Sequence, residues 1–279
     1  MANELVFEGI DFGEGPRWHD GRLWFSDFYQ HKVRAVTPAG EVEVVASVPG
    51  QPSGLGWLPD GRLLIVSMSD RKVLRLDAGE LALHADLAGI ATAHCNDMVV
   101  SATGHAYVGN FGSDILSGAE PVAAKLALVH PDGRTEVAAE GLEFPNGSVI
   151  TPDGTTLIVG ETIGARYTAF DIGDDGQLSG RRVWAELPGH FPDGCSLDAG
   201  GGIWFADAGG KGCLRAVEGG EITNRIETDQ TPYACALGGD DGRTLFILTA
   251  PTAAAGELTG KGLGRLEMTR VEHPHAGLP

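Results

Sequence analysis

The chain has 279 residues, of which 42 are glycine, and its 38 acidic and 20 basic side chains give a formal net charge of −18. Glycine is about twice as frequent as in average proteins, whereas a hydrophobic fraction of 42% excludes a disordered tail. The acidity argues against a nucleic-acid partner, because such binding depends on neutralising phosphates with basic side chains. No apolar run reaches bilayer length and no secretory signal opens the chain, so we expect no membrane partner and a cytoplasmic location.

Short apolar runs bounded by D-G or G-G turns recur along the chain, and such runs are typical of strands. One run, residues 4–9, comes first and stands alone. A unit of similar sequence then repeats six times. The units start at residues 13–18, 52–57, 95–100, 145–150, 192–197 and 232–237. The second residues of these segments are separated by 39, 43, 50, 47 and 40 positions.

Each unit continues with further strands. In the first unit they are a second run from residue 21, a third over 32–37 and a fourth over 41–48. Four short strands per 40–45 residues are typical of propellers, whereas a β-sandwich gives no reason for six aligned copies. We therefore predict an all-β, six-bladed β-propeller with four antiparallel strands per blade, in a single domain over 1–279. The sixth unit supplies only three strands, so residues 4–9 are expected to complete the last blade and protect its edge.

Two units carry insertions after their second strand, over 112–124 and 251–262. Both insertions should lie at the same mouth of the propeller, and long loops of this kind often act as lids or binding loops. Ile115 and Leu116 are apolar in an otherwise small and polar loop. They could cover a ligand or pack beneath the loop. Residues 253–258 are the one stretch with weak helical character.

The second residues of the six units should form a ring at this mouth of the central channel. They are Glu14, Ser53, Asn96, Asn146, Asp193 and Tyr233. Asn and Asp are common turn residues, which explains each singly, but a turn does not call for Glu14. Two carboxylates and two amide oxygens converging on an axis suit a hard divalent cation. Without a cation, Glu14 and Asp193 should repel each other and one pKa should rise.

A second aligned set lies at the ends of the second strands. It comprises Asp27, Ser67, Asn110, Glu161, Asp207 and Thr249. The strings W-F-S-D and W-F-A-D recur as part of the repeat, which favours a structural role for this set. Alternatively, these six residues could line the rim of the site, and Asn110 is kept as a candidate for substrate binding.

The four cysteines, Cys95, Cys195, Cys213 and Cys235, are widely spaced and form no C-x-x-C pair. This spacing argues against a zinc site or a disulfide framework. We expect buried, reduced thiols, as is usual for cytoplasmic proteins.

Five motifs, in this order, resemble the gluconolactonase, regucalcin and luciferin-regenerating-enzyme family. They are E-G-P-R-W at 14–18, N-D-M-V-V at 96–100, F-P-N-G at 144–147, P-D-G-T-T-L-I-V-G-E-T at 152–162 and P-D-G-C at 192–195. The resemblance spans essentially the whole chain. It implies a six-bladed propeller that holds one divalent cation and that usually acts as a lactone hydrolase.

The resemblance also assigns residues. It implies that Glu14, Asn146 and Asp193 are metal ligands, that Asn96 contacts substrate or a metal-bound water, and that Asp193 is the general base. His94 stands where the family commonly has an arginine that binds the hydroxyls of sugar lactones. Histidine offers fewer donors than a guanidinium fork, so a smaller or less hydroxylated lactone becomes plausible. Oxygen ligands favour Ca²⁺, with Zn²⁺, Mg²⁺ and Mn²⁺ as alternatives.

The resulting hypothesis is a metal-dependent lactonase with a small-molecule lactone as its partner. The cation would polarise the carbonyl, Asp193 would take a proton from the attacking water, and Asn96 and His94 would orient the substrate. After Asp193, His94 is the second candidate for the base. His94 could equally be a rim residue without a chemical role. A hydrolase of phosphotriesters or other esters and a non-catalytic cation-binding propeller remain open. We expect a monomer or a weak oligomer.

Overall fold

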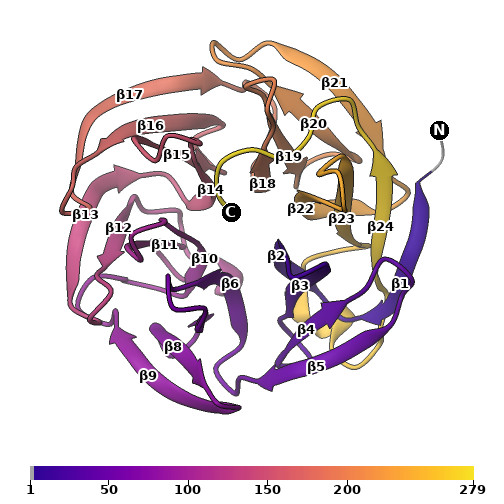
Figure 1. Ribbon diagram of the computed structural model, residues 1–279, viewed down its shortest axis with the longest axis horizontal. Coiled ribbons are helices and arrows are strands. Elements are labelled where there is room, and N and C mark those ends of the chain that lie inside the picture. Colours follow the sequence, from indigo (N-terminus) through magenta and orange to yellow (C-terminus); the bar gives the residue numbers. More distant parts are fainter. Residues whose placement is uncertain (1–2) are drawn as a thin grey trace.

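The predicted architecture is confirmed by a computed structural model, which describes residues 3–279. Six four-stranded antiparallel sheets stand around a central channel as the blades of a propeller (Figure 1). Among the described residues, helix is confined to the two insertions, as one turn of 3₁₀ helix over Ile115–Ser117 and the short helix α1 (Ala255–Leu258). The weak helical character expected near residue 255 is thus confirmed.

Five blades each consist of four consecutive strands, numbered from the innermost outward. Blade 1 comprises β2 (Gly13–His19), β3 (Arg22–Asp27), β4 (Lys32–Val36) and β5 (Val42–Ser47). Blade 2 comprises β6 (Pro52–Trp57), β7 (Leu63–Ser67), β8 (Lys72–Asp77) and β9 (Glu80–Asp86). Blade 3 comprises β10 (Cys95–Val100), β11 (Ala106–Asn110), β12 (Ala124–Val129) and β13 (Thr135–Leu142). Blade 4 comprises β14 (Pro145–Ile150), β15 (Thr156–Glu161), β16 (Arg166–Ile172) and β17 (Leu178–Glu186). Blade 5 comprises β18 (Pro192–Leu197), β19 (Ile203–Asp207), β20 (Gly212–Ala216) and β21 (Ile222–Glu227).

Blade 6 combines the first strand of the described chain with its last three strands, as the strand count predicts. It comprises β22 (Thr231–Gly238), β23 (Thr244–Ala250), β24 (Gly264–Arg270) and, outermost, β1 (Glu4–Ile10). Strands β1 and β24 pair antiparallel, with Glu4 opposite Met268 and Ile10 opposite Gly264. The pairing covers the edge of β24 that the sixth repeat leaves open.

The hydrophobic core lies between neighbouring blades rather than in one central mass. The cluster between blades 2 and 3 is an example, because Leu64 and Val66 of β7 pack with Met98 of β10 and Val108 of β11. Strands alternate their side chains between two faces, so each blade fills the space on both of its sides. All four cysteines are free and buried in these layers.

The final segment of the chain crosses the mouth of the channel opposite the starts of the inner strands. His275 forms a bridge with Asp198 just beyond β18, and Leu278 forms one with Ile150 at the end of β14. The chain end accordingly lies near the centre of the ring in Figure 1. This mouth is therefore covered by the protein itself.

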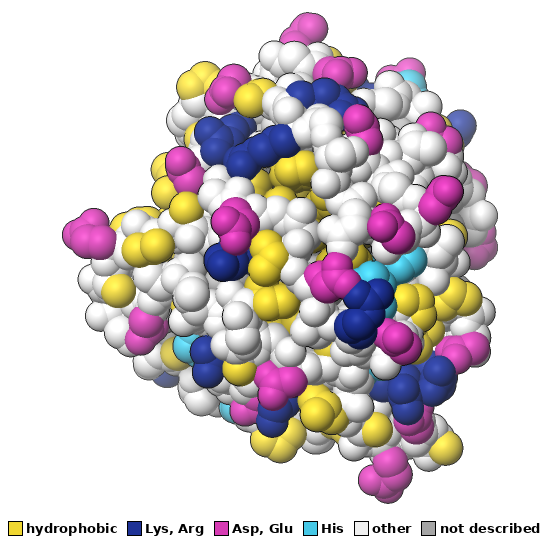
Figure 2. Space-filling model, turned by 90° about the vertical axis from the view of Figure 1, so that its left-hand side faces the viewer, with side chains coloured by type: hydrophobic (Ala, Val, Ile, Leu, Met, Phe, Trp, Pro, Cys, Tyr) yellow, Lys and Arg dark blue, Asp and Glu magenta, His cyan; other side chains and the backbone are white. Residues whose placement is uncertain are grey.

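The outer wall of the ring carries charges of both signs. Figure 2 shows the side on which the outer strands β9, β13 and β17 lie, with acidic side chains scattered among basic ones and small apolar spots between them. Within residues 3–279, no helix is long and apolar enough to span a membrane.

The inner strands pack so closely that a side chain is excluded at some positions, which gives a test of the fold. A Cβ on Gly54 of β6 would stand 2.3 Å from the backbone nitrogen of Met98 in β10, whereas one on Gly89 would meet nothing within 4 Å. We expect Gly54→Ala to lower the free energy of unfolding by about 2 kcal/mol, and Gly89→Ala to change it by less than about 0.5 kcal/mol. Urea denaturation measures both. Equal stability of the two variants would contradict this packing.

Candidate metal and substrate site

A cavity of about 540 Å³ lies at the mouth where the six inner strands begin. Five of the six residues of the predicted ring line it: Glu14, Asn96, Asn146, Asp193 and Tyr233. The sixth ring residue, Ser53, is not among the residues that line the cavity. Its carbonyl oxygen accepts a hydrogen bond of 2.6 Å from the hydroxyl of Ser26. The repeat alignment therefore correctly brings together residues that are up to 219 positions apart in sequence, from 14 to 233.

Register shifts in the inner strands change the direction in which these side chains point. The pairing between the first and second strand of every blade shifts register at the ring position. In β2 the shift falls between Glu14 and Arg17, in β14 between Pro145 and Ser148, and in β18 between Pro192 and Cys195. A bulge of this kind turns a side chain away from its regular face. The ring residues can therefore point along the channel rather than into the space between blades.

The two carboxylates of the ring are buried, with exposed fractions of 6% for Glu14 and 8% for Asp193. Burial raises the pKa of Glu14 well above its usual range, and the neighbouring negative charges of Asp193 and Asp97 raise it further. Burial also raises the pKa of Asp193 to about 8, although the amide of Asn146 partly offsets this effect. The expected repulsion between Glu14 and Asp193 is thus present.

The two asparagines of the ring hold polar atoms without partners. Asn146 donates from Nδ2 to the hydroxyl of Thr162 at 3.1 Å, which leaves its Oδ1 buried and free to accept. The Nδ2 of Asn96 is likewise buried and has no acceptor in the part of the chain described here. Buried polar atoms are rarely left unpaired in folded proteins, so these two point to a bound species that supplies the partners.

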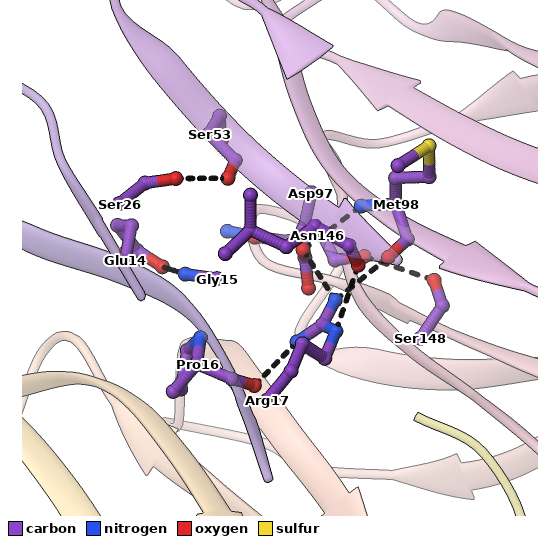
Figure 3. Close-up of polar contacts among 11 residues, drawn as sticks. Glu14, Gly15, Pro16, Arg17, Ser26, Ser53, Asp97, Met98, Asn146 and Ser148 are labelled. Carbon is purple, nitrogen blue, oxygen red and sulfur yellow. Dashed lines mark hydrogen bonds and ion pairs between the residues drawn. The ribbon is translucent and has the colours of Figure 1, made fainter. Parts of the chain in front are cut away.

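A buried ion pair joins Arg17 and Asp97, which follow the ring positions in β2 and β10 (Figure 3). Arg17 of β2 donates to Asp97 of β10 at 2.7 Å, and both side chains are less than 5% exposed. The same guanidinium donates to the carbonyls of Leu55 and Met98, at 3.1 and 2.7 Å. Arg17 therefore ties together the inner strands of blades 1, 2 and 3 and occupies one oxygen of Asp97.

The charges around the channel fit a divalent cation. Glu14, Asp97 and Asp193, when ionised, bring three negative charges against the single positive charge of Arg17, which leaves two uncompensated. No group of three or more His, Cys, Asp or Glu residues that could hold a metal is found within residues 3–279. A cation held by Glu14, Asp193 and the free Oδ1 of Asn146 would therefore rely on few, oxygen-only ligands. Such a set suits Ca²⁺ or another hard cation with open positions.

The structure does not bring His94 and Asn110 to the cavity wall. The ring of His94 packs against Phe111, with centroids 5.8 Å apart, and Phe111 in turn lines the cavity. Asn110 donates to the carbonyl of Lys125 at 2.6 Å and accepts from the N–H of Gly112 at 3.0 Å. The amide of Asn110 is thus used within its own blade. Substrate binding by these two residues stays a prediction.

The other ends of the second strands are used in the same structural way. Asp27 accepts from the N–H groups of Asp11 and Phe12, and Glu161 binds Arg166 and Thr168. None of the six residues of this set lines the cavity. These contacts support the structural role that the repeat favours.

Most of the cavity wall was missed by the sequence analysis. Its large apolar residues outside the ring are Phe12, Phe28, Tyr29, Met68, Phe111, Ile115 and Phe144, and only Ile115 was singled out from the sequence as a residue that could cover a ligand. A signal was available, because Phe28, Met68 and Phe111 each follow directly after the second strand of their unit. Phe12 and Phe144 likewise each stand two positions before a ring residue. Extending the alignment by these two columns would have identified five of the seven.

Both insertions reach the cavity. Ile115 of the first insertion lines it, whereas the side chain of Leu116 lies outside the described residues, so that part of the expectation is not addressed. Residues 253–256 of the second insertion also line the cavity. The hydroxyl of Tyr29 donates to the carbonyl of Ala253 at 2.6 Å, and the carboxylate of Asp11 accepts from the N–H groups of Gly260 and Gly262. The second insertion is therefore fixed to blade 1.

The raised pKa values predict how stability depends on pH. A carboxyl whose pKa is higher in the folded state than in the unfolded state favours folding while it is protonated. In a chelator, the folded protein should therefore lose stability as the pH rises from about 4 through about 8, the folded pKa of Asp193. Added Ca²⁺ should restore most stability at the upper end of this range, because the ionised carboxylates then have a partner. Thermal melts with and without Ca²⁺ measure both effects.

Two variants show whether the loss of stability with rising pH comes from Asp193 or from the many other acidic residues of the chain. Asp193→Asn should flatten the decline in melting temperature between pH 5 and pH 8.5 in chelator. Asp174→Asn, in an exposed turn between β16 and β17, should leave it unchanged. A melting temperature that depends on pH equally in the parent and in Asp193→Asn would contradict the assignment.

Comparisons with known proteins show the family and agree with the fold. A family model described as SMP-30/Gluconolactonase/LRE-like region matches residues 12–251. The 6-deoxy-6-sulfogluconolactonase of Pseudomonas putida is 25% identical, over 96% of this chain and 94% of its own. The solved structure of a gluconolactonase from Xanthomonas campestris superposes with a TM-score of 0.77 at 26% identity, covering 97% of this chain and 88% of that one. The calcium-binding protein regucalcin from Agrobacterium tumefaciens superposes with a TM-score of 0.79 at 24% identity, covering 98% and 96%.

Proposed function

We propose that this chain, which belongs to the SMP-30/Gluconolactonase/LRE-like family, is a metal-dependent lactonase that opens the ring of a cyclic ester by hydrolysis. The observation that carries the proposal is the pair of buried carboxylates, Glu14 and Asp193, beside the unpartnered oxygen of Asn146 at the floor of one cavity. The names of the relatives, a sulfogluconolactonase and a gluconolactonase, support lactones as the substrate class.

We assign the metal ligands to Glu14, Asn146 and Asp193. When bound there, a divalent cation would supply polarisation of the lactone carbonyl and stabilisation of the negative charge that develops on its oxygen. Ca²⁺ is favoured, because the donors are oxygens and two of them are carboxylates. The calcium-binding neighbour regucalcin supports the same choice.

Asp193 is assigned as the general base. Its carboxylate takes a proton from a water molecule whose oxygen attacks the carbonyl carbon, and the ring C–O bond then breaks. The proton passes from Asp193 to the departing ring oxygen, so the product is a hydroxy acid. The free Nδ2 group of Asn96 faces the same cavity and is placed to donate to a substrate oxygen.

Activity should depend on a single added cation. We expect the chelated protein to release no acid from a panel of lactones, and Ca²⁺, Mg²⁺, Mn²⁺ or Zn²⁺ added singly to restore acid release for at least one lactone. A pH indicator in weak buffer reports the hydroxy acid. Absence of metal-dependent acid release from every lactone would contradict the proposed function. Hydrolysis of phosphotriesters instead would move the assignment to another ester class.

Asp193→Asn tests the base. We expect the variant to lose at least about 100-fold in kcat, the scale of a general-base contribution, while its circular dichroism spectrum remains that of the parent. Calcium titration by calorimetry shows whether the loss comes from weaker cation binding or from the missing base. Asp174→Asn is the matched control and should keep full activity. A fully active Asp193→Asn would show that another group is the base.

A further inference from the structure

We infer that the substrate carries an apolar alkyl or aromatic group next to its ester, held between two aromatic walls above the metal ligands. The inference rests on the proposed function, because it names the substrate class of the same site. It is carried by the aromatic residues that line the cavity beside the metal ligands, and one of these, Tyr233, is itself a member of the ring.

The first wall comes from blades 1 and 6. Phe12 is its centre, with ring centroids 5.3 Å from Phe28, 5.7 Å from Tyr29 and 4.7 Å from Tyr233. Aromatic rings at such separations attract one another and hold a rigid surface. The hydrogen bond from Tyr29 to the backbone of Ala253 fixes this wall to the second insertion.

The second wall comes from blades 3 and 4. The rings of Phe111 and Phe144 stack with centroids 4.7 Å apart and planes 19° apart. In a ring of six blades, blades 3 and 4 stand opposite blades 6 and 1 (Figure 1). The two walls therefore face each other across the axis, with the oxygen ligands between them at the floor.

The backbone of Phe144 adopts a conformation that few residues other than glycine adopt. Its φ of +63° lies in the left-handed region, and Gln51, two positions before a ring residue and also in the lining, has a φ of +64°. Residues other than glycine seldom adopt this conformation, although five residues outside the cavity wall also do so in this chain. Phe144 is also followed by Pro145, which further narrows the choice of backbone conformation.

The charges of the lining select against ionised and heavily hydroxylated substrates. No Lys, Arg or His is among the lining residues within the described chain, and the only charged side chains are Glu14 and Asp193. A sulfonate or carboxylate substituent would therefore find no cationic partner. The hydroxyls of a sugar lactone would lose water against the aromatic walls, with few donors or acceptors in return.

Paired lactones of the same ring size test the inference. In the Ca²⁺-loaded protein, a δ-lactone with a pentyl side chain and a benzo-fused δ-lactone are compared with glucono-δ-lactone. Each methylene that becomes buried should raise kcat/KM about fourfold, so we expect at least a tenfold preference for both apolar lactones. Equal or better turnover of glucono-δ-lactone would overturn the inference while leaving the lactonase intact.

A binding measurement separates the inference from the proposed function. The δ-lactam analogues of the pentyl and glucono compounds have an amide in place of the ester and resist hydrolysis. Calorimetry should find that the pentyl lactam binds at least about tenfold more tightly. If it does so while no lactone is hydrolysed, the proposed function fails and the apolar cavity stands. Tighter binding of the glucono lactam overturns the inference whatever the activity.

Two equivalent phenylalanines provide a variant and its control. Phe144 and Phe191 each precede the proline that begins an inner strand, but only Phe144 lines the cavity, whereas Phe191 is 44% exposed. We expect Phe144→Ala to weaken binding of the pentyl lactam at least about fivefold, because aromatic surface is lost from the wall. Binding of the glucono lactam should change less than twofold. Phe191→Ala should alter neither, and equal losses in both variants would contradict the assigned wall.

Discussion

The close approach of six inner strands around one axis is the constraint on which the rest of the structure depends. The residue after the ring position is glycine in four of the six blades, at 15, 54, 147 and 194. A Cβ on Gly147 would stand 2.3 Å from the carbonyl oxygen of Asp193, and one on Gly54 as close to the backbone of Met98. At Gly54 and Gly147 the neighbouring inner strands can approach this closely only because the side chain is absent. The glycines thus set the diameter of the channel, and the diameter brings the ring residues together.

The same constraint accounts for the electrostatics of the site. Blade 3 departs from the glycine pattern with Asp97, whose side chain is compensated by Arg17 from blade 1. Removing one buried member of such an ion pair and leaving the other charged costs about 3–5 kcal/mol. Asp97 therefore needs Arg17 at this narrow level of the channel. Glu14 and Asp193 form no ion pair with a basic side chain within residues 3–279, and burial raises the pKa of both. Because Arg17 pairs with Asp97, its charge does not fully neutralise the two ring carboxylates.

Sequence alone was enough to predict the features that the repeat dictates. The six blades, the closure by β1 and the ring at one mouth all follow from counting strands and turns. The aromatic walls were not predicted, since a lone Phe28 or Phe144 is equally consistent with a core position until the blades are placed around an axis. His94 shows the limit of position alone, because it stands where the family commonly has an arginine, two positions before Asn96, and its ring packs against Phe111 without being among the residues that line the cavity.

The floor and the walls of the cavity are under different physical constraints. Floor residues lie on buried inner strands, where glycine spacing, bulges and charge balance leave little freedom to change one residue alone. Most wall residues lie in connections between strands, such as Phe28 after β3 and Phe111 after β11, where side chains can differ without disturbing the ladders. Reaction type should therefore follow from the floor and substrate class from the walls. In this chain a two-carboxylate floor suited to a cation stands beneath walls without cationic or abundant polar groups, and that combination matches an ester centre attached to an apolar body.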